Sequence, residues 1–177
     1  METDQLRHRL LAVTALASDY CAALENAREM ERREFVMAML DFLPRIYWEF
    51  SSINVDEADD SAEYEYFPSY VDEDFYESVR RNAEMLLGPD DTFLETFEED
   101  MKYSETPIAA SVSESLADIF QPLYNFISVV RESEGESAGA AFRECKENFE
   151  SYWAQTLCNV MRPLNNIRYS PDFNTEE

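Results

Sequence analysis

Apolar side chains recur at steps of three and four residues over five stretches of the chain, a spacing that places them along one face of a helix. The five stretches are about 4–25, 29–50, 72–87, 111–130 and 137–165. In the fourth stretch, one stripe is formed by Val112, Leu116, Ile119, Leu123, Phe126 and Val130. A second apolar stripe lies beside it, so we expect this helix to be the centre of a helical bundle.

Local signals define where some of these helices begin and end. Ser111 is followed three residues later by Glu114, the spacing of a capping box at a helix start. Gly88 and Pro89 end the third helix. After them we expect a short helix from residue 90 or 91 to about residue 101, begun by one of the two aspartates there, and then a turn over 103–110.

Two prolines interrupt the helical patterns. Pro44 and Pro122 each lack the backbone N–H and crowd the preceding turn, which predicts a kink or an early end at Pro44 and a kink at Pro122. No stretch of useful length shows the alternation typical of a strand. Only 3 glycines are present, which argues against all-β folds and against phosphate-binding loops.

The sequence therefore predicts an all-α protein in one domain over 1–177, a helical bundle of about five major helices with kinked helices and a long connection. The connection covers 51–70 and is acidic and aromatic, and the tail over 166–177 is expected to be frayed.

Charge is the most unusual feature of the composition. The chain has 14 Lys and Arg against 38 Asp and Glu, a net charge of −24. Between residues 46 and 101 eighteen acids face only Arg80 and Arg81, so −16 of the charge lies there. Such a balance disfavours direct binding to nucleic acids and to anionic membranes. It permits a basic protein partner, cation binding or mimicry of nucleic acid.

The few cysteines and the single histidine limit the metal sites and nucleophiles that the chain could form. The cysteines Cys21, Cys145 and Cys158 have no paired spacing, and His8 is the single histidine. This pattern is typical of buried thiols in a reducing cytoplasm and argues against zinc sites and a cysteine nucleophile. The start METDQ does not resemble a signal peptide, and no apolar run approaches the roughly 20 residues of a membrane-spanning helix.

The strongest candidate site is a polar line on the expected central helix: Glu114, Asp118, Gln121 and Asn125. With Glu98 and Glu99 from upstream, the carboxylates Glu114 and Asp118 could bind Mg or Mn through oxygen ligands. The spacing only poorly matches that of all-α pyrophosphohydrolases, E-E-x-x-E followed by E-x-x-D. We favour the alternative that the line is solvent-facing, since burying unpaired carboxylates is costly.

A second candidate is the aromatic cluster at the end of the acidic connection. Tyr64, Tyr66, Phe67 and Tyr70 could form a docking surface for a basic, apolar partner. The alternative, which we favour, is that these rings lie back on the bundle and cover apolar surface.

The stretch EDMKYSETPIAASVSESLADIFQ resembles a family of bacterial proteins of similar length, common in gut Bacteroidetes and known only as a domain of unknown function. The resemblance is strongest over about 85–126 and extends over most of the chain. It implies an all-helical cytoplasmic protein and assigns no activity, cofactor or site residue. The family has no proline at the position of Pro122, so we expect a kink there to be particular to this chain.

Three hypotheses for the function follow. The leading one is a non-enzymatic, acidic interaction protein of the cytoplasm that binds no cofactor and pairs with a basic protein. The second is a hydrolase that uses Glu98, Glu99, Glu114 and Asp118 with Mg or Mn. The third, nucleic-acid mimicry, requires carboxylates spaced along a surface like phosphates.

Overall fold

The computed structural model describes residues 2–55, 66–95 and 108–175, and these residues form an all-α domain. Its long helices are α1 (Glu2–Glu25), α2 (Arg32–Ser52), α3 (Glu73–Leu87), α4 (Val112–Glu132) and a C-terminal helix. The C-terminal helix consists of α5 (Ala138–Asn148), the π-helical segment η4 (Phe149–Trp153) and α6 (Ala154–Arg168). The predicted fold class and number of major helices are confirmed.

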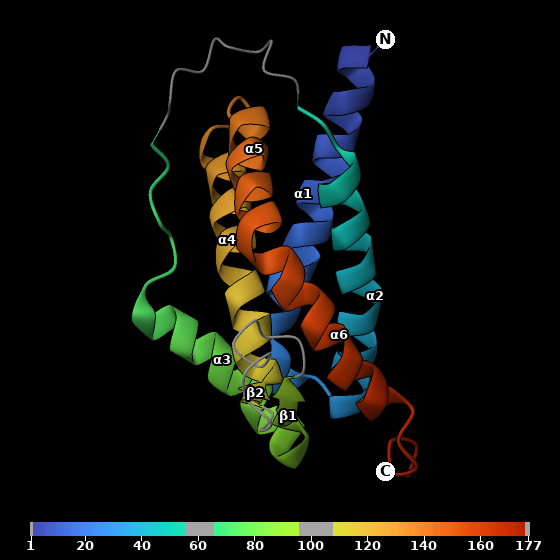
Figure 1. Cartoon of the computed structure of the whole chain (residues 1–177). Coiled ribbons are helices and arrows are strands. Elements are labelled where there is room, and N and C mark those ends of the chain that lie inside the picture. The colour runs from blue at the N-terminus through green and yellow to red at the C-terminus, as the bar shows by residue number, and fades with distance from the viewer. Residues whose placement is uncertain (1, 56–65, 96–107, 176–177) are drawn as a thin grey trace.

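Four of these helices lie side by side along the length of the molecule. Figure 1 shows α1, α2, α4 and the α5–α6 helix forming a bundle, with α3 crossing the lower part of α4. Helix α4 contacts α1, α3, α5 and α6, and α2 packs against α6 and α1. Helix α4 is therefore the centre of the bundle, as its two apolar stripes predicted. Within the described residues no helix has the length and apolar character needed to cross a membrane.

Aromatic side chains fill the middle of the core. Phe50 of α2 is fully buried. Its ring lies 4.8–6.2 Å, between centroids, from four other rings: Phe126, Phe142, Phe149 and Trp153. Offset and edge-on ring pairs at these distances contribute about 1 kcal/mol each beyond the area they bury. The contacts join α2, α4 and the C-terminal helix into one core.

The two prolines do not end their helices. Pro44 lies inside α2 and Pro122 lies inside α4, and both helices continue to Ser52 and Glu132 respectively. Each helix is held on both sides of its proline by buried apolar residues, because tertiary packing compensates for the missing backbone hydrogen bond. The early end considered at Pro44 is therefore wrong, and a kink at either proline stays a prediction.

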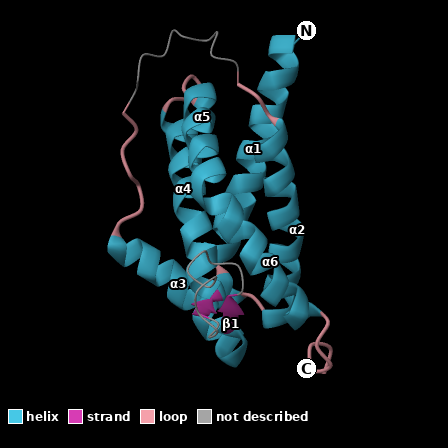
Figure 2. Ribbon diagram, viewed as in Figure 1, coloured by secondary structure: helices cyan, strands magenta, loops and turns pink. Residues whose placement is uncertain are grey.

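A short hairpin replaces the helix and turn expected after Pro89. Residues 88–91 form a 3₁₀ turn, η2 (Gly88–Asp91), and the chain then enters strand β1 (Thr92–Glu95). Strand β1 pairs antiparallel with β2 (Ile108–Ser111), with Thr92 opposite Ser111 (Figure 2). The helix predicted from residue 90 or 91 and the turn over 108–110 are wrong in their described parts. The backbone of Thr92–Glu95 pairs with the distant strand β2 instead of forming hydrogen bonds within a helix.

Two residues of the C-terminal tail, Ile167 and Phe173, are buried against the bundle. Helix α6 continues to Arg168, beyond the expected end at residue 165. Phe173 is only 5 % exposed, and the guanidinium of Arg168 lies 5.2 Å from its ring centroid. This cation–π contact and the burial of the ring hold the tail against the bundle. Helix α6 therefore takes up the first three residues of the expected tail, and fraying beyond Phe173 stays a prediction.

Candidate functional site

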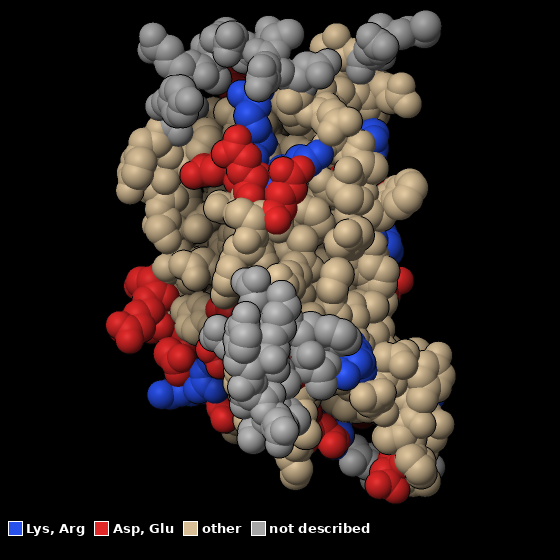
Figure 3. Space-filling model, viewed as in Figure 1, with Lys and Arg blue, Asp and Glu red and all other residues tan. Residues whose placement is uncertain are grey.

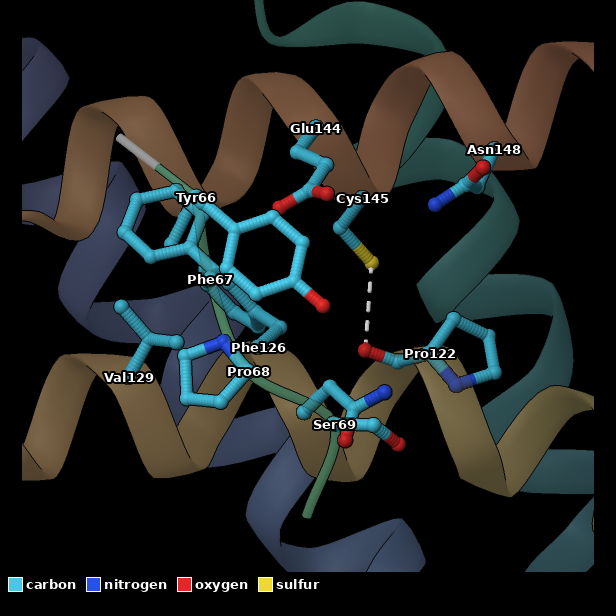
Figure 4. A pocket seen from close by; sticks show the side chains of 12 residues that line it. Tyr66, Phe67, Pro68, Ser69, Pro122, Phe126, Val129, Glu144, Cys145 and Asn148 are labelled. Carbon is cyan, nitrogen blue, oxygen red and sulfur yellow. Dashed lines mark hydrogen bonds between the residues drawn. The ribbon is translucent and has the colours of Figure 1, made fainter. Parts of the chain in front are cut away.

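A pocket of about 160 Å³ lies between the segment 66–69, helix α4 and helix α5. Figure 4 shows Glu144, Cys145 and Asn148 directed into the pocket from α5. Pro122 and Phe126 form the opposite wall on α4, and Tyr66 lies in front with its hydroxyl toward the pocket centre. Three segments far apart in the sequence therefore build this site.

Hydrogen bonds from α4 position the segment that carries Tyr66. The backbone N–H of Tyr70 donates to Oδ1 of Asn125 at 2.8 Å. The hydroxyl of Tyr70 donates to Oε2 of Glu132 at 2.6 Å, near the end of α4. This bond raises the pKa of the Tyr70 phenol. These two hydrogen bonds of Tyr70 hold the segment 66–70 across α4, so the front wall of the pocket has a defined position.

Cys145 and Pro122 face one another across the pocket. The thiol of Cys145 donates to the carbonyl of Pro122, with Sγ 3.6 Å from the oxygen. Burial, and then the charge of Glu144, raise the pKa of this thiol above its usual range. A protonated thiol is a poor nucleophile and a poor metal ligand. Cys145 therefore acts as a wall of the pocket and not as a reactive group.

Glu144 supplies the charge of the pocket. Loss of solvation raises the pKa of its carboxyl, and the neighbouring charge of Glu147 raises it further. Of the described residues, twelve line the pocket, and none of these is Lys or Arg. Around Glu144 the lining offers polar side chains and aromatic rings: Tyr66, Phe67, Ser69, Asn125, Phe126 and Asn148. A cationic group is the ligand that such a lining favours, through hydrogen bonds and ring faces.

The polar line on α4 connects the central helix to its neighbours. Oδ1 of Asp118 accepts the hydroxyl of Tyr76 in α3 at 2.6 Å, and Oδ2 accepts the hydroxyl of Tyr152 in η4 at 3.2 Å. Asn125 binds Tyr70 as described above. Asp118 and Asn125 are half-buried, whereas Glu114 at the helix start is exposed. The capping bond predicted at Ser111 is confirmed, since the N–H of Glu114 donates to its Oγ at 3.2 Å.

The predicted metal ligands are only partly covered by the structure. Glu98 and Glu99 lie outside the described residues. Among the residues that the structure describes, no three His, Cys, Asp or Glu side chains are grouped closely enough to hold a metal ion. Binding of Mg or Mn by Glu98, Glu99, Glu114 and Asp118 stays a prediction.

The aromatic cluster divides into exposed and packed members. Tyr66 is 92 % exposed, whereas Phe67 and Tyr70 are half-buried and pack against the core. Tyr64 lies outside the described residues. Tyr66 and Phe67 line the pocket, so two of the residues singled out in the sequence take part in it. A docking role for the cluster stays a prediction.

Sequence reasoning did not identify the α5 side of the pocket. Glu144 and Asn148 are four residues apart and therefore lie on one face of α5. That spacing is common on solvated helices, and it carries no information about the distant segment that approaches it.

Figure 3 shows acidic side chains gathered over α5 and over α3 on the viewed face, with basic side chains beside them.

Comparison with known proteins gives a family and a solved relative. The family model described as Domain of unknown function (DUF5063) matches residues 5–170. The crystal structure of protein BF1032 from Bacteroides fragilis, a structural genomics target, superposes with a TM-score of 0.78 at 33% sequence identity. The match covers 92% of this chain and 94% of that one. The comparison with curated proteins gives no significant match.

Proposed function

This chain belongs to the DUF5063 family, a domain of unknown function, and we propose that it is a non-enzymatic binding protein of the cytoplasm whose partner is a basic protein. The observation that carries the proposal is the pocket beside α5, where Glu144 and the ring of Tyr66 meet without a lysine or arginine in the lining. A lysine or arginine side chain of the partner would supply the missing cation.

The chemistry of the pocket suits a cationic side chain. The carboxylate of Glu144 would accept charge-assisted hydrogen bonds, which are about twice as strong as neutral ones. The ring of Tyr66 would attract the cation through its face, an interaction of roughly 0.5–2 kcal/mol. The side-chain amide of Asn148 offers one more acceptor. An arriving cation would also stabilise the ionised form of Glu144, which is disfavoured without it.

The charge of the whole molecule supports the same partner. A net charge of −24 attracts basic molecules at long range and accelerates their association, with an effect that salt screens. The three cysteines are free thiols, two of them buried, which supports a reducing compartment such as the cytoplasm.

The hydrolase alternative has less support. It requires Glu98, Glu99, Glu114 and Asp118 to converge on Mg or Mn. Both carboxylate oxygens of Asp118 already accept tyrosine hydroxyls, so a metal ion would have to displace or share these bonds.

Binding of a defined peptide tests the proposal. The probe is a short fluorescein-labelled peptide with several arginines, compared by anisotropy with the same peptide carrying glutamates at those positions. We expect the arginine peptide alone to bind, and more weakly as the ionic strength rises from about 0.01 M to about 1 M, where the Debye length falls to ~3 Å. Equal binding of the two peptides, or binding of neither, would overturn the proposal.

Matched variants then ask whether the pocket is the binding site. Glu144→Gln removes the charge that faces the pocket, and we expect an affinity loss of roughly tenfold, about 1.4 kcal/mol. Glu150→Gln removes the same charge from the next turn of the C-terminal helix, on an exposed residue outside the pocket lining. It should change the affinity less than about twofold, because surface charge is well screened. Equal effects of the two variants would assign binding to the general surface charge and not to the pocket.

A further inference from the structure

A second surface, which shares no lining residue with the pocket beside α5, is formed by α1 and α2. A groove of about 310 Å³ lies between these helices and is lined by Ala12, Leu16, Pro44, Arg45, Trp48 and Glu49. Trp48 is 66 % exposed. We call this surface, with the groove, the Trp48 face. A large exposed aromatic side chain beside a groove marks an interaction site.

The wall of the groove is fixed before any partner arrives. Nη2 of Arg9 in α1 lies 3.1 Å from Oε2 of Glu49 in α2 and 2.7 Å from Oγ of Ser52. This ion pair joins the two helices that enclose the groove. A preformed site loses less conformational entropy on binding than one that must be ordered.

Charge separates the Trp48 face from the rest of the molecule. Around the groove Arg9 and Arg45 are matched by Asp41 and Glu49, so the charges balance here within a chain whose total is −24. A basic partner is attracted by the acidic surplus elsewhere in the chain. An acidic partner meets little repulsion on the Trp48 face, and the chain itself is such a partner.

The groups on this face also complement one another across a two-fold axis. Asp41 and Arg45 lie one turn apart on the exposed side of α2, with Oδ2 2.9 Å from Nη1, and both side chains are more than half exposed. When two α2 helices pack antiparallel, Arg45 of each lies opposite Asp41 of the partner subunit. A protruding Trp48 next to an apolar groove is likewise self-complementary, as an isologous interface requires.

We propose that the Trp48 face binds a second copy of this chain. In the resulting symmetric dimer, Trp48 of each subunit enters the groove of the other, and Asp41 and Arg45 pair across the axis. The pocket beside α5 is not part of this interface, so the dimer would present two such pockets.

Sedimentation equilibrium of the full chain over a range of concentrations tests the proposal. We expect a species of twice the 20.6 kDa chain mass that dissociates on dilution. Trp48→Glu should raise the dissociation constant by roughly 30-fold or more, as loss of a central aromatic anchor does. The control Met85→Glu adds the same charge at a 73 % exposed apolar residue on α3 and should leave the mass unchanged. Circular dichroism verifies that both variants remain folded.

A charge exchange sharpens the test. Asp41→Arg and Arg45→Asp, made singly, should each weaken the dimer because like charges then meet across the axis. The double variant restores opposite charges and should recover the dimer. A wild-type chain that is monomeric at every concentration would overturn the proposal. So would a dimer whose dissociation constant is unaffected by Trp48→Glu, or equally affected by the Met85 control.

Discussion

Two carboxylates support the central helix α4 by the same chemistry in two different surroundings. At the helix start, Asp91 is 7 % exposed and accepts the N–H of Ser113 at 2.7 Å, its hydroxyl at 2.8 Å and the hydroxyl of Ser111 at 3.0 Å. In the middle of the helix, Asp118 is half-buried and accepts two tyrosine hydroxyls. From this difference we expect the number of hydrogen bonds to each carboxylate, and the access of water to it, to decide how much it contributes to stability.

The position of Asp91 adds a second contribution. Its negative charge lies against the first turn of α4, where the partial positive charge of the helix dipole and the free N–H groups are located. Asp91 lies just before strand β1, whereas α4 begins directly after strand β2. It therefore caps α4 from the other strand of the hairpin and does not begin a helix of its own. The hairpin β1–β2 brings it there by pairing Thr92 with Ser111.

The largest effect is expected from Asp91→Ala. The variant leaves the buried N–H and hydroxyl of Ser113 without their acceptor and removes the charge at the helix start. Each unsatisfied buried group costs about 1–3 kcal/mol, so we expect the free energy of unfolding to fall by about 3 kcal/mol. Urea-induced unfolding followed by circular dichroism measures it. Asp19→Ala, at an exposed aspartate of α1, should change the value by less than about 0.5 kcal/mol. Similar losses in the two variants would show that Asp91 has no special role.

An intermediate effect is expected from Tyr76→Phe, which removes the shorter of the two bonds to Asp118. The half-buried carboxylate can bind water in its place, so we expect a loss of about 1 kcal/mol in the free energy of unfolding at neutral pH. A loss as large as that of Asp91→Ala would contradict the comparison.

The same variant should change the response to alkali. Burial, and then the bond to Asp118, raise the pKa of the Tyr76 phenol above its usual range, and burial raises that of Tyr20. Above pH ~10 the unfolded chain loses phenolic protons that the folded chain retains, so the free energy of unfolding falls as pH rises. Tyr76→Phe should reduce this slope but not abolish it, because Tyr20 remains. An unchanged slope between pH 9 and 11 would contradict the assignment.

The smallest effect is expected from Tyr152→Phe. Tyr152 is 59 % exposed and its bond to Asp118 is 3.2 Å long, so water replaces it readily. We expect a change below about 0.5 kcal/mol in the same urea experiment. A larger loss than that of Tyr76→Phe would reverse the order of the two donors.

The sequence predicted the features that depend on local spacing. The stripes of α4, the cap at Ser111 and the end of α3 at Gly88 follow from residues within a few positions of one another. The strand Thr92–Glu95 was missed because its four residues show no clear alternation and its partner lies beyond an intervening segment. The burial of Phe173 was missed for a related reason, since nothing near it in the chain indicates the surface that it covers.

The candidate site was predictable only in part. Tyr66 and Phe67 stood out as aromatic residues in a polar connection, and Asn125 stood out on the polar line of α4. Glu144 resembled any exposed acid of an amphipathic helix. Its importance depends on the approach of residues 66–69 to α5, and Tyr70 fixes that approach through contacts 55 and 62 positions away in the chain.

The π-helical segment Phe149–Trp153 determines the rotational phase of everything that follows it. Such a segment holds one residue more than an α-helical turn would, and each residue of an α-helix advances its side chains by about 100°. Deleting a single residue here would let the segment close into a regular α-helix and would leave the buried face of α6, with Leu157, Val160 and Leu164, in place. The same deletion elsewhere in α5 or α6 would turn every later side chain by about 100°. Chains that share this bundle are therefore expected to differ by one residue in this segment more readily than outside it.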